Sequence, residues 1–352
     1  MTERDHREAG REEPAPASRV DRREFLRRAG WSVGLSAAAA YLALAPERWP
    51  LSRRDFDGAR AAADRPLKRL PVGGYAVDAA PGAAALGIAR GENWRAMIRA
   101  AVDAIGGLDH FVRPGDVVVI KPNAAFGRAP ALGATTNPEV LAALVALLRE
   151  AGAREIRVAD NPIESPRACF ERSGLAAAAV ASGARLMVPG PRSFVELETP
   201  GAALIPRWPV FWEPLRGADK VIGLAPVKDH NLAGASLSAK NWYGLLGGRR
   251  NQFHQDIHTI IADLVQMMRP TFVLLDGSRV LRRNGPTGGN LDDVESGRTI
   301  VASRDALAAD AWAWTELLGR ATPPPAYLEL ARARGLGDPD WRGRPWREVQ
   351  VG

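Results

Sequence analysis

The stretch DVVVIKPN, from Asp116 to Asn123, decides the class of fold. Its four consecutive β-branched residues, Val117–Ile120, do not alternate with polar residues, which is typical of a strand covered on both faces in a parallel sheet. The following TTNP segment predicts the start of a helix, because Asn137 can cap it and Pro138 suits its first turn. A buried strand that leads into a helix indicates an α/β protein.

The same order of strand and helix recurs along the chain. A second strand is expected at residues 155–160 and a second helix from Ser165 to Gly174. We therefore predict a mainly parallel sheet flanked by helices, with a ligand crevice at the carboxyl ends of its strands. Further strands are expected at residues 75–79, 185–188, 220–224, 271–276 and 298–302, and further helices at 93–105, 255–268 and 304–318.

The composition is that of an ordinary globular protein and excludes several classes. The chain has 352 residues, of which 46% are hydrophobic and 25% charged. Its net charge is +7, but no long basic run with interleaved aromatic residues is present, so we expect no nucleic-acid partner. The single cysteine, Cys169, excludes an internal disulfide and a cysteine-ligated iron–sulfur cluster.

The N-terminus carries a targeting pattern. Residues 22–27, RREFLR, match the twin-arginine export signal, and an apolar segment of 17 residues follows at Ala29–Ala45. That length is marginal for crossing a bilayer, which takes about 20 residues. We expect the twin-arginine machinery to export the protein to the periplasm or to the outer face of the cytoplasmic membrane. Cleavage of the signal and its retention as a membrane tether both stay open.

This layout divides the chain into four regions. Residues 1–45 are the signal or anchor, and residues 46–72, rich in Arg, Ala and Pro, form a linker. The α/β domain is expected at 73–320. Residues 321–352 form a C-terminal tail that packs on the domain, with Trp341 and Trp346 as its contacts.

The lysines point to a ligand site. The chain has 47 lysines and arginines, yet only five of them are lysine, and three of those lie in polar clusters after apolar runs. Lysine differs from arginine because its pKa shifts readily when it is buried. Since parallel strands end at one edge of a sheet, we expect these clusters to share a crevice. The residues in question are Lys121 and Asn123, Asp160, Lys228 and His230, Lys240 and Asn241, and Asp276.

Their residue types suggest a small anionic ligand and proton transfer. Lys121, Asn123, Thr135 and Thr136 would seat a carboxylate or phosphate near a helix start. Lys228 or Lys240, together with His230, would transfer a proton or hold a cofactor, since an imidazole titrates near neutral pH. Asp160, Asn241, His254 and Asp276 complete the predicted ligand contacts.

Two further features have alternative interpretations. His254 and His258 have the i, i+4 spacing of helical metal ligands, but one histidine contacting the ligand and the other lying on the surface is the competing interpretation. The segment GPTGG at residues 285–289 is a turn between strands or a loop that covers the ligand. Serine-hydrolase, P-loop and Rossmann motifs are missing from strand–turn–helix contexts, which disfavours those classes.

The ordered motifs resemble the family called domain of unknown function 362, from about residue 75 to residue 319. The chain departs from that family at Asp229, where relatives often carry threonine, and lacks the ferredoxin-type cysteine module of many members. A second likeness is to the nickel-pincer lactate racemases, which implies a nickel-type cofactor as one alternative. The motifs are VIKPN at 119–123, TTNP at 135–138, KDH at 228–230, KNWYG at 240–244, His254, DG at 276–277, GPTG at 285–288 and DALAAD at 305–310.

Two functions are compatible with these observations. The first is an exported enzyme, an isomerase or oxidoreductase, acting on a small anionic molecule. The alternative is a non-catalytic ligand-binding or cofactor-handling protein of the cell envelope. Fold alone does not separate them, because function resides in the site.

Overall fold

The computed structural model describes residue 63, residues 65–321 and residues 323–352, which lie within one compact unit, Asp55–Gly352. The predicted twin-arginine motif, the apolar segment that follows it and most of the predicted linker lie outside the described residues. Among the described residues, no helix combines the length and apolar character that crossing a membrane requires.

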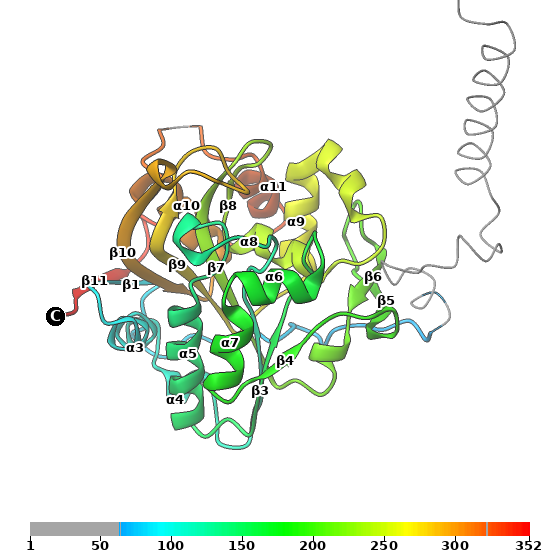
Figure 1. Ribbon diagram of the computed structural model, residues 1–352, viewed down its shortest axis with the longest axis horizontal. Helices are drawn as coiled ribbons and strands as arrows, with labels where there is room; N and C mark the ends of the chain where they lie inside the picture. Colours follow the sequence, from blue (N-terminus) through cyan, green and yellow to red (C-terminus); the bar gives the residue numbers. More distant parts are fainter. Residues whose placement is uncertain (1–62, 64, 322) are drawn as a thin grey trace, which may run out of the picture. The chain divides into compact units, whose positions relative to one another are not determined.

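The described elements alternate between strands and helices along much of the chain (Figure 1). The strands are β1 (Leu86–Arg90), β2 (Val117–Lys121), β3 (Glu155–Ala159), β4 (Arg185–Met187), β5 (Phe194–Glu198), β6 (Arg207–Phe211), β7 (Lys220–His230), β8 (Gly234–Ser236), β9 (Phe272–Leu281), β10 (Val294–Ser303) and β11 (Trp346–Gln350). The α-helices are α3 (Trp94–Ala104), α4 (Leu108–Phe111), α5 (Pro138–Glu150), α6 (Pro166–Arg172), α7 (Leu175–Ala181), α8 (Ser238–Asn241), α9 (Ile257–Met267), α10 (Ala306–Glu316) and α11 (Tyr327–Ala333). The short 3₁₀ helices include η4 (Trp242–Leu245) and η5 (Arg250–Asp256).

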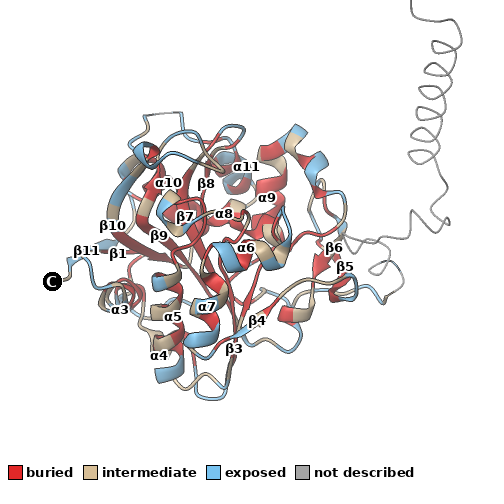
Figure 2. Cartoon of the chain, viewed as in Figure 1, coloured by how far each residue is buried: buried red, intermediate tan, exposed pale blue. Residues whose placement is uncertain are grey.

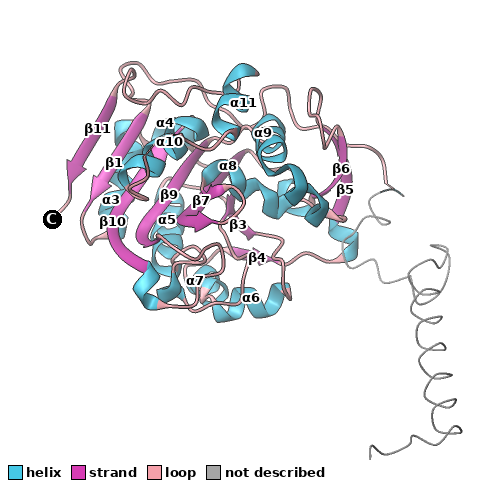
Figure 3. Ribbon diagram, turned by 90° about the horizontal axis from the view of Figure 1, so that it is seen from above, coloured by secondary structure: helices cyan, strands magenta, loops and turns pink. Residues whose placement is uncertain are grey.

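The main sheet is mostly parallel, which confirms the predicted fold class. Within the described residues it has nine strands in the order β11-β1-β10-β9-β7-β2-β3-β4, with β8 paired to β7 (Figure 3). The run from β9 to β4 is parallel throughout. The pairs β9–β10 and β10–β1 are antiparallel, so the sheet is mixed at one side. A separate hairpin pairs β5 with β6.

Helices cover both faces of this sheet. In β7, Val221, Ala225 and Val227 pack into the core beneath α8, α9, α10 and α11, while Ile222 and Leu224 pack into the core beneath α3, α5 and α7. Figure 2 shows the central strands buried and the outer helix faces exposed. The uninterrupted apolar sequence of the inner strands follows from this arrangement, because both sides of each strand are covered.

The predicted start of α5 is confirmed in detail. The Asn137 side chain accepts a hydrogen bond from the Glu139 amide at 3.1 Å, and Pro138 occupies the first turn. The helix buries Leu141 and Leu144 against the sheet. Its start is thereby fixed directly beside the carboxyl ends of the parallel strands.

Several element boundaries differ from the sequence prediction. Residues 75–79 form no strand, and the first described strand is β1, whose glycine and alanine content hid its pattern. The predicted helix 255–268 begins only at Ile257, because η5 precedes it. Strand β9 continues past Asp276 to Leu281, so Asp276 lies within the strand and not at its end.

The C-terminal tail is part of the sheet. Strand β11 pairs in parallel with β1, which the sequence did not suggest. Tyr327 in α11 is fully buried and donates a hydrogen bond to Asp310 at 2.9 Å. Trp341 is buried, whereas Trp346 is 45% exposed and lies edge-on to the Trp341 ring.

Gly87 tests how tightly α3 packs on β1. A Cβ atom at this position would overlap the carbonyl oxygen of Ala101 and lie 2.8 Å from Ala104 Cβ. We expect Gly87→Ala to lower the free energy of unfolding by about 1–3 kcal/mol, measured by urea denaturation. The control is Gly190→Ala, whose added Cβ has Ser193 Oγ as its nearest neighbour at 4.0 Å and should change stability by about 0.5 kcal/mol or less. Equal effects of the two changes would contradict this packing.

Candidate functional site

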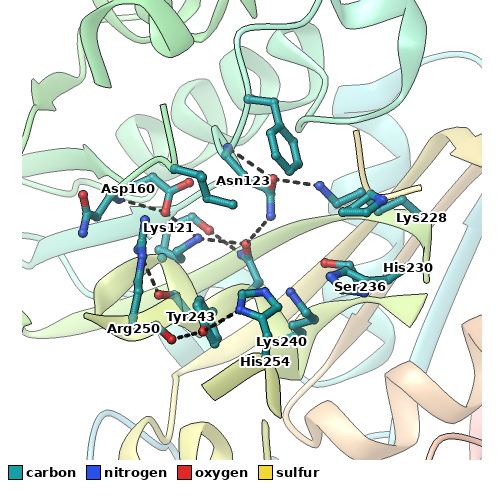
Figure 4. A pocket seen from close by; sticks show the side chains of 17 residues that line it. Lys121, Asn123, Asp160, Lys228, His230, Ser236, Lys240, Tyr243, Arg250 and His254 are labelled. Atoms are coloured by element: carbon teal, nitrogen blue, oxygen red, sulfur yellow. Dashed lines mark hydrogen bonds and ion pairs between the residues drawn. The ribbon is translucent and has the colours of Figure 1, made fainter. Parts of the chain in front are cut away.

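A cavity lies where β2, β3 and β7 end, beside α8, η4 and η5 (Figure 4). We call it the lysine cavity after Lys121, Lys228 and Lys240, which line it together with His230, Arg250 and His254. Its volume, measured as the space open to the centres of water molecules, is about 80 Å³. The structure therefore brings the lysine clusters of the sequence together in one hollow at the predicted edge of the sheet.

A buried ion pair forms the floor of the cavity. Lys121 Nζ, at the end of β2, lies 2.7 Å from Asp160 Oδ1, directly after β3, and both side chains are 1% exposed. The second carboxylate oxygen accepts the Ala124 amide at 2.7 Å. Burial lowers the pKa of Lys121, and the charge of Asp160 acts in the opposite direction. The two neighbouring strands are thus joined by charge where they open into the cavity.

Gly244 in η4 lies directly over this ion pair. A Cβ atom there would overlap Asp160 Oδ1 and lie 2.7 Å from Lys121 Nζ. The carbonyl of Gly244 accepts the Asn161 amide at 2.8 Å. Only a glycine lets the backbone approach so closely, which accounts for the last residue of the KNWYG motif.

Two asparagines link the ion pair to a second lysine. Asn241 Oδ1 accepts hydrogen bonds from Lys121 Nζ at 2.9 Å and from Asn123 Nδ2 at 3.1 Å. Asn123 Oδ1 in turn accepts from Lys228 Nζ at 3.1 Å. The chain of contacts from Asp160 to Lys228 is continuous, so these five side chains hold one another in place.

Lys228 is buried without a carboxylate partner among the described residues. Its amine donates to the Ala134 carbonyl at 2.6 Å and lies 5.2 Å from the centre of the Phe126 ring. Burial, followed by the charges of Lys240 and Lys121, lowers its pKa well below the ordinary value. An anion that entered the cavity would restore a favourable environment for the charged amine.

His230 is held as a neutral donor, which corrects the expectation that it titrates near neutral pH. Its Nδ1 accepts the backbone amides of Leu232 and Ala233, each at 3.2 Å. Because Nδ1 must be unprotonated to accept them, the ring proton lies on Nε2. Burial, with the charges of Lys240 and Lys228, lowers the His230 pKa to about 2. This imidazole can therefore donate a hydrogen bond to a ligand but cannot accept a proton at neutral pH.

His254 has the opposite tautomer. Its Nδ1 lies 3.1 Å from the Asn251 carbonyl, which can only accept, so Nδ1 carries the proton and Nε2 is free. Its ring stacks over that of His230 with centres 6.5 Å apart. Burial lowers the His254 pKa, and the charge of Lys240 acts in the same direction. His254 therefore supplies an unprotonated imidazole nitrogen beside the cavity.

Lys240 is the least constrained of the three lysines. It lies in α8, is partly buried, and its Nζ makes no hydrogen bond or ion pair to any described residue. Its amine lies 5.2 Å from the centre of the Tyr243 ring. Burial, then the charges of Arg250 and Lys121, lowers its pKa to about 8. Figure 4 shows Lys240 on the same side of the cavity as His254.

Arg250 was not predicted from the sequence. It is 7% exposed and donates to the carbonyls of Pro162, Tyr243 and Leu246 at 2.7 to 3.2 Å. Since 42 of the 47 basic residues are arginine, one buried arginine leaves no signal in the sequence. Together with the three lysines, Arg250 brings the cationic side chains of the cavity lining to four, against the single carboxylate of Asp160. The lining therefore has an excess of three positive charges when all of these groups are ionised.

The loop after β9 reaches the cavity through Pro286. The Gly285 amide donates to Asp229 Oδ2 at 2.8 Å, and Arg320 pairs with the other oxygen of the same carboxylate. The GPTGG segment lies between the antiparallel strands β9 and β10, as one interpretation predicted, and its Pro286 also contributes to the cavity wall. Asp229 in β7 thereby fixes that loop.

Four predicted site residues lie outside the cavity lining. Thr136 Oγ1 donates to the Leu224 carbonyl at 2.9 Å, and Thr135 is buried beside it. Asp276 accepts the Asn137 amide at 2.7 Å, so the protein's own carboxylate occupies the place near the start of α5 where we expected a ligand anion. His258 lies in α9 and stacks on Tyr327, because η5 ends between the two histidines and turns them apart.

The donor set does not fit a metal held by protein side chains. Within the described part of the chain, no group of three or more His, Cys, Asp or Glu residues could hold a metal ion. Nδ1 of His230 is occupied by two amides, which leaves Nε2 of His254 as the unprotonated imidazole nitrogen of the cavity. We therefore assign no reaction step to nickel or to another metal.

Comparison with known proteins gives a family, one relative in sequence and one weak structural match. The family model "Domain of unknown function (DUF362)" matches residues 118–315. The thylakoid-associated protein sll1697 of Synechocystis sp. is 28% identical over 232 residues, which cover 61% of this chain and 67% of that protein. The lactate racemase apoprotein of Thermoanaerobacterium thermosaccharolyticum matches with a TM-score of 0.33 and 13% identity. That match covers 56% of this chain and about half (52%) of the racemase structure, and it is too distant to indicate a shared reaction.

Asp160→Asn tests the buried ion pair. Removing the carboxylate leaves Lys121 buried among other cations, so we expect the free energy of unfolding to fall by about 3–5 kcal/mol. The control is Glu150→Gln, which breaks exposed pairs with Arg95 and Arg99 and should cost less than about 1 kcal/mol. Urea denaturation measures the free energy of unfolding of both variants. A similar loss of stability in the two would show that the buried pair of Lys121 and Asp160 stabilises the fold no more than an exposed pair does.

The lowered pKa of His230 leads us to predict that the protein loses stability in acid. The folded protein keeps it neutral down to pH of about 2, whereas the unfolded chain binds a proton below its ordinary pKa of 6.5. Stability from this residue is therefore lost as the pH falls below 6.5. Between pH 6.5 and 5 the loss amounts to about 2 kcal/mol.

The measurement compares urea denaturation of the wild type and His230→Gln at pH 7 and at pH 5. Glutamine can still accept an amide but takes up no proton, so the variant should lose about 2 kcal/mol less on acidification. An identical pH dependence of both proteins would mean that His230 is accessible to protons in the folded state.

Proposed function

The chain belongs to the DUF362 family, and we propose that its lysine cavity makes it an enzyme that binds a small anionic molecule and transfers a proton on it. The three lysines, two histidines and one arginine of the cavity all fall within the matched residues 118–315. The proposal therefore concerns the part of the chain that defines the family.

The excess of buried cations is the observation that carries the proposal. Lys228, Lys240 and Arg250 have no carboxylate within ion-pair distance among the described residues. Buried charges without a counterion are costly, and a bound anion offsets that cost. Electrostatic attraction is also strongest in a site shielded from water. A carboxylate or phosphate group is the ligand that such a cavity favours.

The volume of the cavity limits the size of the ligand. About 80 Å³ is open to the centres of water molecules, room for roughly 5–8 waters. A molecule with a single carboxylate and a few further heavy atoms matches that space. Larger ligands would have to extend past Ile163, which is 52% exposed at the cavity wall.

The two histidines and Lys240 divide the roles of proton transfer. His254 Nε2 is unprotonated and acts as the base. Lys240, with a pKa of about 8, is charged at neutral pH yet releases its proton more readily than an ordinary lysine, so it acts as the acid. His230 donates its Nε2 hydrogen to an oxygen of the ligand, while Lys228 and Arg250 hold the anion.

The N-terminal pattern suggests where this reaction takes place. We propose that residues 22–27 direct export by the twin-arginine machinery, with the apolar segment as signal or tether. The protein would then work in the periplasm or on the outer face of the cytoplasmic membrane. A relative described as thylakoid-associated agrees with a location at a membrane.

Anion binding tests the proposal with matched lysine variants. We expect isothermal titration with pyruvate or phosphate at low salt to detect binding, and Lys228→Met to weaken it at least about tenfold, the loss of one well-placed charge interaction. Methionine leaves no buried charge, so the variant should remain folded. The control is Lys220→Met at the opposite end of β7, outside the cavity lining, which should bind as the wild type does.

Turnover separates an enzyme from a binding protein. Native mass spectrometry of protein purified from its own host identifies any retained small molecule, and parallel metal analysis records any bound nickel. With that molecule as substrate, His254→Gln should abolish turnover and keep affinity within about threefold, since the base acts in the transition state. Binding without any turnover by the wild type would favour the cofactor-handling alternative. Equal loss of affinity in Lys220→Met and Lys228→Met would refute the cavity as the site.

A further inference from the structure

We propose that Lys240 is a nucleophile that forms an imine with a carbonyl group of the bound anion, which makes small oxo acids the substrate class. This inference rests on the proposed function, because the same cavity must first hold the anionic group. It replaces the acid role of Lys240 with a covalent one and adds a chemical class of ligand to that function.

The contacts of the three lysines single out Lys240. Lys121 Nζ is held by Asp160, Asn241 and the Pro122 carbonyl at 2.7 to 2.9 Å. Lys228 Nζ is held by Asn123 and Ala134 at 3.1 and 2.6 Å. Lys240 Nζ makes no such contact with any described residue, although its side chain lines the same cavity (Figure 4). Its amine can therefore form a new bond without first breaking hydrogen bonds.

Burial and the surrounding cations increase the fraction of Lys240 that is uncharged. The pKa of about 8 leaves roughly one amine in ten unprotonated at pH 7, against fewer than about one in a thousand for an ordinary lysine. Only the unprotonated amine attacks a carbonyl carbon. Burial, and after it the charges of Arg250 and Lys121, thus prepare Lys240 as a nucleophile.

The other side chains of the cavity supply what imine formation requires. His254 Nε2 accepts a proton from the Lys240 ammonium, and the free amine then forms a carbon–nitrogen bond with the carbonyl carbon. His230 donates a hydrogen bond from Nε2 to the carbonyl oxygen as negative charge develops on it. The carbon–oxygen bond then breaks and the oxygen leaves as water. Of the two protons that this oxygen takes up, one comes from His254 and the other from the amine nitrogen. In balance, one ammonium and one carbonyl give one iminium ion and one water, with no change of oxidation state.

The iminium ion would also serve the proposed proton transfer. Its positive nitrogen withdraws electrons from the neighbouring carbon, which makes a hydrogen there more acidic. His254, again neutral after the water has left, is the adjacent base. The carboxylate of the oxo acid would remain with the cationic side chains of the cavity, Lys228 among them.

Reductive trapping tests the covalent step. The full chain is incubated at pH 8 with pyruvate or glyoxylate and sodium cyanoborohydride, which reduces an iminium ion to a stable amine. Intact-mass and peptide mass spectrometry should find one adduct per chain on Lys240, with the mass of the oxo acid less one oxygen atom. Lactate, which has a hydroxyl in place of the carbonyl, should give no adduct.

Two variants serve as controls for folding and for charge. Lys240→Arg keeps the positive charge but cannot form an imine, so it should lose the adduct while still binding phosphate within about threefold of the wild type. Lys240→Gln should also lose the adduct, and its thermal unfolding reports whether the fold is intact. Lys220→Arg, outside the cavity, should give the adduct as the wild type does.

Each outcome bears on one proposal. Binding of pyruvate without an adduct, or labelling spread evenly over Lys68, Lys220 and Lys240, overturns the role of Lys240 and leaves anion binding intact. Binding of phosphate but of neither oxo acid overturns the substrate class. Failure to bind any of these anions overturns the proposed function itself, and with it the covalent step.

Discussion

The ion pair between Lys121 and Asp160 is the constraint on which the rest of the site depends. Two charges removed from water stabilise a protein only when their remaining hydrogen-bonding groups are also satisfied. Here the carboxylate accepts the amides of Ala124 and Asn161, and the amine donates to Asn241. These contacts lock the ends of β2 and β3 to α8. Asn241 passes this constraint on to Asn123, and Asn123 passes it on to Lys228.

Buried carboxylates elsewhere in the fold hold the surrounding elements. Asp310 accepts the amides of Ser238 and Ala239 at 2.8 and 3.0 Å, and so anchors the start of α8, which carries Lys240. Asp305 caps α10 through the Leu307 amide at 2.9 Å. Both acidic residues of the DALAAD motif therefore have structural roles. Asp310 also influences the cavity, because it anchors the helix that carries Lys240. Burial raises the pKa of Asp310 to about 6.

The backbone gives two chemically identical histidines opposite roles. His230 accepts from two amides and is left with a proton on Nε2, whereas His254 donates to a carbonyl and keeps Nε2 free. Neither assignment depends on a ligand. The site thus combines a neutral hydrogen-bond donor, His230, with an unprotonated base, His254, and an amine without hydrogen bonds, Lys240. Such a site suits the chemistry of a carbonyl group on an anion, because one group stabilises the developing negative charge and another accepts the proton.

The amino-acid sequence was enough to predict the α/β class, the capped start of α5 and the gathering of Lys121, Lys228 and Lys240 at one edge of the sheet. Strand ends and helix caps are local patterns, and this is why they can be read from the sequence. It could not determine the tautomers of the histidines or the contribution of Arg250, and it placed Asp276 at the end of a strand that continues to Leu281. It also missed β11 on the sheet edge. Those features depend on which backbone groups from distant segments meet. Contacts between distant segments set the pKa values, the close approach of Gly244 to the ion pair and the order of the strands, and such contacts exist only in the folded chain.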